Sequence, residues 1–300
     1  MGLVFLASFL AFLGPPASAP IPFTYFDNRM LIRCTIDGRQ FTTIVDTGDP
    51  GMTITPETAR TLGLRVRSNG AETGAGNRAV TSGATTLASL RIGPESFTNI
   101  ATDVVDLGEI RRRFHFPHLD GIVGYSILQR FAVRVDVDSQ TIVLERSAPV
   151  VPGGATQTAF TLVGTIPEIA AKVDGVATTV VIDTGDRSSL TLFGPFARAN
   201  GFYDRYPSQR NIITGYGLGG PIYADVFRLP SVEVLGMRLT QVVTRASRQT
   251  GGAFTDTQQG GSIGTGILKR FNIVYDYPRH RMYSWPSKLF ASPDRFVAPG

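Results

Sequence analysis

The segment Thr42-Thr43-Ile44-Val45-Asp46-Thr47-Gly48-Asp49 is an apolar stretch that runs into an acidic turn. The same pattern returns in the second half of the chain as Thr179-Val180-Val181-Ile182-Asp183-Thr184-Gly185-Asp186. A β-branched run that ends in a carboxylate and a glycine can be simply a buried strand leaving its sheet. A strand end needs only a turn residue, so this interpretation does not explain why carboxylate, hydroxyl and glycine recur together. The two aspartates are therefore predicted to belong to one shared site.

The repeat extends well beyond these two segments. Each copy follows an Asp-Gly turn, at Asp37-Gly38 and at Asp174-Gly175. The closing stretches 124–145 and 264–285 also match, with the pairs Ile127-Leu128 and Ile267-Leu268, Arg130-Phe131 and Arg270-Phe271, and Asp136 and Asp276. Matching segments that recur in the same order indicate an internal duplication. The duplication predicts two homologous lobes within one chain, which would make the protein a monomer built as an intramolecular pseudo-dimer.

The chain divides into four predicted parts. Residues 1–19 resemble a signal peptide, because an apolar run at 3–13 precedes the small residues Ala17-Ser18-Ala19. The run is about half of the roughly 20 residues that a membrane span needs. We expect export to the periplasm or the extracellular space and no stable membrane insertion after signal removal; an uncleaved anchor and a mis-assigned start stay open as alternatives. A lobe at 20–146, a linker rich in proline and glycine at 147–155, and a second lobe at 156–300 follow.

The amino-acid composition limits the classes of protein to which this chain can belong. The chain has 300 residues, of which 42% are hydrophobic and 18% are charged, as in globular proteins with sizeable cores. Its net charge is +5, but the arginines are scattered apart from Arg111-Arg112-Arg113, so no nucleic-acid partner is expected. The single cysteine, Cys34, excludes an intramolecular disulfide and is expected to be a small buried residue on a strand.

Local patterns in the first lobe predict short strands joined by tight turns. Residues 30–36 and 41–45 read as two strands around the Asp37-Gly38 turn. Residues 56–63 read as a short helix, with Thr55 as its N-cap and Pro56 in its first turn. The same order of strands and hairpins repeats in the second lobe, so the chain is predicted to be mainly β.

Two glycine-rich loops match weak dinucleotide-binding fingerprints. Gly215, Gly217 and Gly220 fit the G-x-G-x-x-G pattern, and the loop with Gly74 and Gly76 fits its relaxed form. That fingerprint requires a following helix, whose N-terminus meets the pyrophosphate. Here the residues after Gly220 alternate as a strand does. We therefore predict hairpin tips instead of a nucleotide site.

Two carboxylates a few ångströms apart cannot both ionise readily, so one keeps its proton while the other acts as a base. Such a pair suits general acid and base catalysis on a water molecule. With two Asp-Thr-Gly turns, and with the stretches 119–124 and 262–264 after them, the chain resembles the aspartic protease superfamily of pepsin and the retroviral proteases. The resemblance implies an all-β, bilobal fold of two homologous β-barrel-like lobes with a cleft between them.

The resemblance also implies roles for individual residues. Asp46 and Asp183 would be the catalytic pair, Thr47 and Thr184 would grip one lobe to the other, and Gly48 and Gly185 would allow the close approach. The two glycine-rich hairpins would be flaps over the cleft, with Gly74, Gly76, Gly215, Tyr216 and Gly217 near the substrate. For Tyr216, an ordinary exposed turn tyrosine remains an equal alternative.

The function implied by the resemblance is endopeptidic hydrolysis of a polypeptide substrate, with neither a metal nor an organic cofactor. The alternative is an exported binding protein that keeps the fold without catalysis. One departure from the family pattern stands out, since Asp49 and Asp186 occupy positions where pepsin-like enzymes usually have Ser or Thr. Near the pair, their charges would raise its proton affinity. Facing solvent, they would only cap the following turn.

Overall fold

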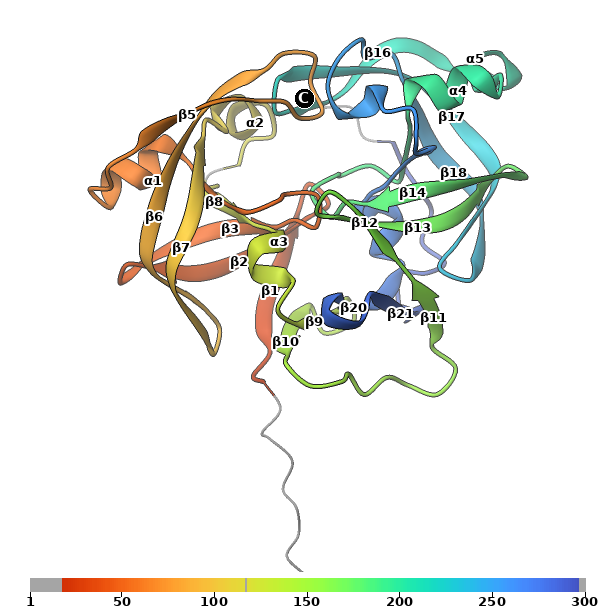
Figure 1. The fold of residues 1–300 in the computed structure, drawn as a ribbon. Coiled ribbons are helices and arrows are strands. Elements are labelled where there is room, and N and C mark those ends of the chain that lie inside the picture. Colours follow the sequence, from red (N-terminus) through yellow and green to blue (C-terminus); the bar gives the residue numbers. More distant parts are fainter. Residues whose placement is uncertain (1–17, 117, 297–300) are drawn as a thin grey trace, which may run out of the picture.

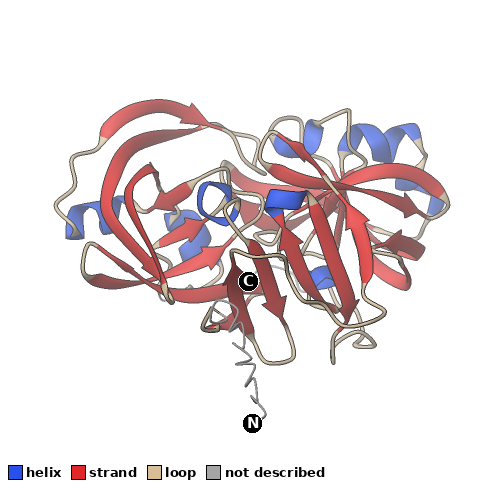
Figure 2. Ribbon diagram, turned by 60° about the horizontal axis from the view of Figure 1, so that its bottom comes forward, coloured by secondary structure: helices blue, strands red, loops and turns tan. Residues whose placement is uncertain are grey.

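The computed structural model describes residues 18–116 and 118–296. Residues 1–17 of the predicted signal peptide lie outside the described residues. Strands predominate and are arranged in two lobes, drawn red to yellow and green to blue in Figure 1. Figure 2 shows that the helices in both lobes are short. The mainly β, two-lobed architecture predicted from the sequence is confirmed.

The first lobe is built from short strands and three short helices. Its strands are β1 (Ile21–Phe26), β2 (Arg29–Ile36), β3 (Arg39–Val45), β4 (Met52–Ile54), β5 (Arg67–Glu72), β6 (Val80–Ile92), β7 (Glu95–Val105), β8 (Gly121–Val123), β9 (Ala132–Asp136) and β10 (Thr141–Glu145). Its helices are α1 (Pro56–Thr61), α2 (Gly108–Arg113) and α3 (Tyr125–Leu128).

The second lobe follows the same plan. Its strands are β11 (Thr156–Ala159), β12 (Thr161–Val163), β13 (Ile166–Val173), β14 (Val176–Ile182), β15 (Leu190–Leu192), β16 (Gln209–Gly217), β17 (Gly220–Val234), β18 (Met237–Ser247), β19 (Gly261–Ile263), β20 (Phe271–Asp276) and β21 (Arg281–Pro286). Its helices are α4 (Gly194–Ala199), α5 (Phe202–Arg205) and α6 (Thr265–Leu268), with 3-10 turns at Ala253–Thr255 and Tyr277–Arg279.

Local sequence accounts for the elements around the first repeat. In β2 the side chains of Met30, Ile32 and Cys34 are buried while Arg33 between them is exposed, because successive strand residues face opposite sides of the sheet. The prediction for Cys34 is thereby confirmed. The hydroxyl of Thr55 accepts a hydrogen bond from the Thr58 amide at 3.2 Å and caps α1, as predicted.

Each lobe supports its Asp-Thr-Gly turn on the same strand arrangement. In the first, β3 pairs in parallel with β8, β8 pairs antiparallel with β4, and β4 pairs in parallel with β7. In the second, β14, β19, β15 and β18 repeat these pairings in the same order. The duplication read from the sequence is therefore a duplication of topology.

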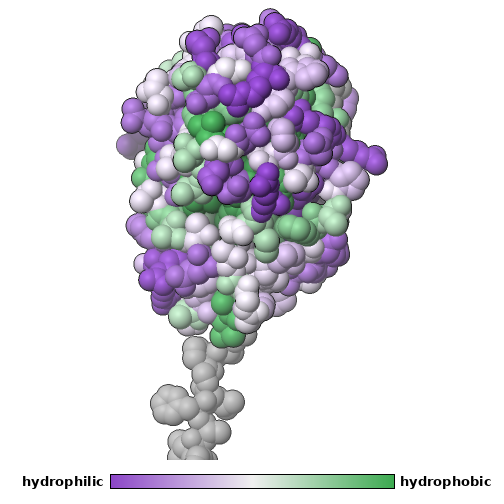
Figure 3. Space-filling view, turned by 90° about the vertical axis from the view of Figure 1, so that its right-hand side faces the viewer, coloured by the Kyte–Doolittle hydropathy of each residue, from purple (hydrophilic) through white to green (hydrophobic). Residues whose placement is uncertain are grey.

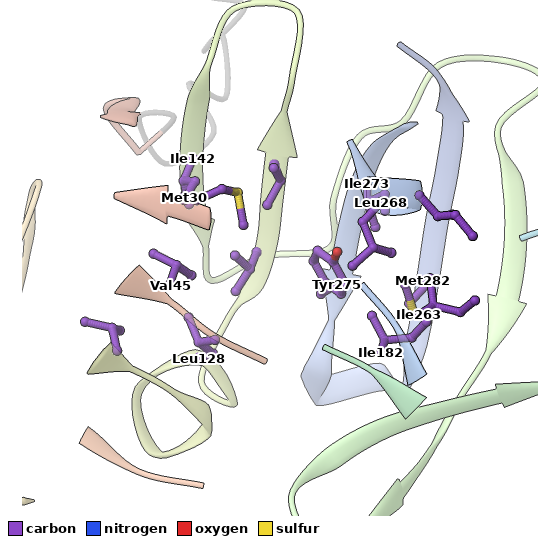
Figure 4. Packing of buried hydrophobic residues seen from close by; sticks show 14 of the residues in the cluster. Met30, Val45, Leu128, Ile142, Ile182, Ile263, Leu268, Ile273, Tyr275 and Met282 are labelled. Carbon is purple, nitrogen blue, oxygen red and sulfur yellow. The ribbon is translucent and has the colours of Figure 1, made fainter. Parts of the chain in front are cut away.

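Strands from both lobes also form a common sheet, in the order β11-β21-β20-β9-β10-β1. One apolar core runs through the two lobes beside this sheet. In Figure 4, Met30 and Val45 lie in the left part of this core, and Tyr275, Ile182 and Ile263 lie to their right. Burial of this continuous apolar surface stabilises the two lobes as one unit.

The surface seen in Figure 3 is mostly hydrophilic, with small hydrophobic areas between the polar residues. Of the large hydrophobic side chains in the described part of the chain, Val66 and Val150 are exposed. No helix within residues 18–116 and 118–296 combines the length and the apolar character that crossing a membrane requires.

Candidate active site

The two Asp-Thr-Gly turns meet at the junction of the lobes. Asp46 follows β3, and its amide donates to the Val123 carbonyl in β8 at 3.0 Å. Asp183 follows β14, and its amide donates to the Ile263 carbonyl in β19, also at 3.0 Å. The two aspartates therefore leave equivalent strands with equivalent backbone support.

The two threonines join the turns through reciprocal hydrogen bonds. The Thr184 hydroxyl accepts from the Thr47 amide at 2.9 Å and donates to the Val45 carbonyl at 2.8 Å. The Thr47 hydroxyl accepts from the Thr184 amide at 3.0 Å and donates to the Ile182 carbonyl at 2.7 Å. Both threonines are almost fully buried, so the four bonds are shielded from water and fix one turn against the other.

The glycines permit the carboxylates to approach. A Cβ atom on Gly48 would lie 2.8 Å from the Asp183 carboxyl carbon, and one on Gly185 would lie 2.0 Å from Asp46 Oδ2. The Gly185 amide donates to Asp46 Oδ1 at 3.1 Å and to Asp183 Oδ1 at 2.9 Å. Gly48 adds a donor to Asp46 Oδ1 at 2.7 Å. The two carboxyl groups thus share one backbone donor and form a single unit.

Burial and like charge raise the proton affinity of this unit. Burial, followed by the Asp49 charge, raises the pKa of Asp46 to about 6, although the hydrogen bond from the Gly48 amide opposes the shift. Burial, followed by the charges of Asp46 and Asp186, raises the pKa of Asp183 well above its usual range. Above about pH 6, where Asp46 ionises, the two carboxyls therefore hold one proton, mainly on Asp183.

The raised pKa of Asp183 predicts that the close arrangement of the two aspartates lowers the stability of the protein at neutral pH. Because the pKa of Asp183 is higher in the folded than in the unfolded protein, the native state binds more protons, and the free energy of unfolding falls as pH rises from about 4. Asp183→Asn removes the titrating group. We expect the variant to be more stable than the parent at about pH 7 and similar to it at about pH 4, measured by urea unfolding. Parallel pH dependences for the two proteins would contradict the assignment.

The two acids that follow the turns lie near the pair but in different surroundings. Asp49 accepts from the Gly51 amide at 2.8 Å and from the Thr53 hydroxyl at 3.1 Å. Asp186 is 8% exposed and pairs with Arg245, whose Nη2 lies 2.8 Å from Asp186 Oδ1. Each acid caps its turn and also lies within electrostatic reach of the pair, so the alternative that these side chains face solvent and only cap the turn is wrong.

Their pKa values move in opposite directions. Burial raises the pKa of Asp49 to about 6, and nearby acids add to the effect. Burial acts in the same sense on Asp186, but the Arg245 guanidinium and the hydrogen bonds from Ser188 outweigh it and lower its pKa. The second lobe thus carries an ionised Asp186 beside Asp183, and the positive charge of Arg245 offsets it.

Residues 27–29, at the β1–β2 turn of the first lobe, bind the Asp-Thr-Gly turn of the second lobe. Asn28 donates to the Arg187 carbonyl at 2.7 Å, and Arg187 Nε donates to Asp27 Oδ1 at 2.7 Å. Arg29, 7% exposed, donates from Nε to the Gly185 carbonyl at 2.9 Å. These contacts add a second cross-lobe connection to that of the threonines.

A cavity of about 670 Å³ opens beside the pair and is lined from both lobes. It is covered by what we call the roof, the loop at 73–79 and the hairpin tip at 215–220. The Gly76 amide donates to the Leu218 carbonyl at 2.8 Å, and the Arg78 amide to the Gly219 carbonyl at 3.2 Å. In Figure 1 the loop between β5 and β6 reaches across the top of the molecule toward β16.

The structure brings most of the predicted flap residues to this cavity. Gly74, Gly215, Tyr216 and Gly217 line it, and Gly76 packs within the roof, where a Cβ would lie 2.2 Å from the Gly219 carbonyl carbon. Tyr216 is only 8% exposed, so the alternative of an exposed turn tyrosine is wrong. Apolar side chains of both lobes complete the walls: Val105, Leu107, Ile110, Leu119, Ile122, Ile166, Ile222 and Phe254.

Three arginines beside the Asp-Thr-Gly turns were not predicted from the sequence: Arg29, Arg187 and Arg245. Arg245 carried a signal, because it interrupts the otherwise uncharged stretch 242–247 within a strand pattern. Arg29 and Arg187 carried none, since charged residues next to turns are ordinary on protein surfaces.

Comparison with known proteins agrees with this geometry. Residues 32–127, which contain Asp46, match the sequence model of the aspartyl protease family. Among solved structures, the chain is similar to an aspartic proteinase from Irpex lacteus, with a TM-score of 0.57 and 12% sequence identity. That alignment covers 92% of this chain and 99% of the other. No curated protein matches the chain in sequence. The similarity in structure confirms the bilobal fold.

Proposed function

We propose that the chain belongs to the aspartic protease superfamily and is an endopeptidase that cleaves polypeptides with a water molecule activated by Asp46 and Asp183; the family match of residues 32–127 and the bilobal fold support this. The observation that carries the proposal is the shared Gly185 amide, which donates to both carboxylates. A purely structural turn does not require two buried acids to share a donor, and holding them so is costly.

The proton affinities assign a role to each carboxyl. Asp46, with the lower pKa, is the base that takes a proton from the attacking water. Asp183 donates its proton to the carbonyl oxygen, so the water oxygen adds to the carbon and a gem-diol forms. In the collapse, the C–N bond breaks, Asp46 protonates the leaving nitrogen and Asp183 recovers its proton from the diol. Both carboxyls return to their starting states.

The cavity supports a polypeptide as the substrate class. Its walls are apolar on both sides of the pair, which suits apolar side chains flanking the scissile bond. The roof excludes water from the reacting groups once substrate is bound, which strengthens their electrostatic interactions.

The test is hydrolysis of a denatured protein by the purified chain, from acidic to neutral pH, with and without pepstatin. We expect fragments from internal cleavage, and we expect pepstatin to suppress them by occupying the cavity beside Asp46 and Asp183. A chelator should leave the rate unchanged. An absence of cleavage across the pH range would favour a binding protein, and cleavage that resists pepstatin but not a chelator would point to another mechanism.

A further inference from the structure

The strand registers of the two lobes identify equivalent positions around the catalytic turns. Asp49 bonds to Thr53, and Asp186 bonds to Thr191 at 3.0 Å between Oδ2 and Oγ1. Thr53 pairs with Asp103 across the parallel strands β4 and β7. Thr191 pairs with Arg245 across the parallel strands β15 and β18. Asp103 and Arg245 therefore occupy the same place in the two copies, where the charge is inverted.

In the second lobe Arg245 is buried and forms close contacts with three side chains. Arg245 is 5% exposed, with Nη2 at 2.8 Å from Asp186 Oδ1 and Nε at 2.6 Å from the Thr191 hydroxyl. Its guanidinium also lies over the Phe254 ring, 5.5 Å from the centroid. A buried guanidinium with this set of partners has one preferred position, and it fixes the Asp186 carboxylate in turn.

Asp186 is connected directly to the catalytic carboxyl. Its backbone amide donates to Asp183 Oδ1 at 2.9 Å, and its side chain accepts from the Ser188 amide at 2.9 Å. Other charges face it as well: Arg29 from β2, itself paired with Asp27, and the catalytic Asp183 on its own turn. Arg245 contributes the positive charge that contacts the Asp186 carboxylate.

The first lobe lacks this neutralisation. In the part of the chain that the structure describes, no basic side chain forms an ion pair with Asp49. The charged groups that act on it include Asp103 and Glu72, both acidic, and it faces Asp46 as well. The two otherwise equivalent turns are thus electrostatically different, and the difference originates in one residue on β18.

We propose that Arg245 is a positioning residue for the catalytic pair: it holds Asp186 against the Asp183 turn and offsets the negative charge that Asp186 places beside Asp183. This inference rests on the proposed peptidase function. It adds a residue that lines the cavity and bonds to Asp186 and Thr191 instead of the reacting carboxyls, yet sets the pH range in which the pair works.

The two members of the ion pair should act with opposite signs. Arg245→Met removes a positive charge and leaves Asp186 unopposed, so ionisation of the pair becomes harder and the acidic limb of kcat/KM against pH moves up by about one unit. Asp186→Asn removes a negative charge and leaves Arg245 unopposed, so the limb moves down by a similar amount, about one unit. In the double variant both charges are absent. Its acidic limb should therefore differ from the limb of the parent by only a fraction of that shift.

Two further variants separate charge from structure. Arg238→Met makes the same chemical change at an exposed position on the same strand. The acidic limb of its kcat/KM profile should coincide with that of the parent. Arg245→Lys keeps the charge but not the two-point geometry, so it should restore the limb while kcat remains below that of the parent. If Arg245→Met does not fold, the downward shift of Asp186→Asn still tests the proposal. Limbs that coincide for parent, Asp186→Asn and any folded Arg245→Met would overturn it.

A second measurement is independent of activity. In protein labelled with ¹³C at the aspartate carboxyl carbons, the NMR titration of Asp183 reports its ionisation directly. We expect its midpoint to fall in Asp186→Asn relative to the parent and to be unaffected in Arg238→Met. If no variant cleaves substrate but the midpoints move as expected, the proposed function fails and the role of Arg245 stands. If the proteins cleave substrate but the midpoint does not move, the role of Arg245 fails alone.

Discussion

Replacing either Asp46 or Asp183 by Asn is expected to remove nearly all peptide hydrolysis, by about 10⁴-fold or more in kcat. Asn has the same shape and keeps an Oδ1 acceptor for the Gly48 and Gly185 amides, so folding should be preserved. It can neither take a proton from water nor return one. The double variant should be scarcely slower than either single variant, because residues that act as a unit are strongly non-additive.

The measurement is kcat and KM on a peptide substrate, with circular dichroism to verify folding. Asp204→Asn is the matched control, since it makes the same change at an 83% exposed side chain in α5 and should leave kcat unchanged. Substantial turnover in either single catalytic variant would mean that the reaction does not depend on the pair. Equal losses in all three variants would point to a general effect of removing acids.

Thr184→Ala is expected to give the largest loss of stability among conservative changes near the site. It removes the hydroxyl that pairs with the buried Thr47 amide and with the Val45 carbonyl. Leaving buried polar groups unsatisfied costs about 1–3 kcal/mol each, so a loss of about 2–6 kcal/mol is expected for the two groups. This is a large share of the roughly 5–15 kcal/mol that stabilises typical proteins. Urea denaturation measures it.

Thr184→Ser is the matched control, because it deletes only the methyl group and keeps the hydroxyl. It should retain most of the stability and most of the activity. By the pseudo-symmetry of the lobes, Thr47→Ala should resemble Thr184→Ala, and the two changes together should cost less than their sum. Should Thr184→Ala and Thr184→Ser prove equally stable, the threonine bonds are not what joins the turns.

The sequence by itself determined the parts of this protein that depend on local pattern or on repetition. The alternation of Met30, Ile32 and Cys34 specifies a strand with one buried face, because side chains alternate across a sheet. Thr55 before Pro56 specifies the start of a helix, because its hydroxyl satisfies a free amide. The repeated acidic turns predicted two lobes and the pair Asp46 and Asp183, since duplication turns a weak local motif into two matched ones.

Only the tertiary structure decided which charges surround the pair. Asp49 and Asp186 are the same residue in the same local pattern, yet one faces Asp103 and Glu72 while the other is neutralised by Arg245. That partner lies on β18 and reaches the turn only because β15 pairs with it in parallel. Neither a local pattern nor the internal repeat predicts the partner of a charge, because the pairing depends on strands far apart in sequence and on a desolvation cost set by the packed core.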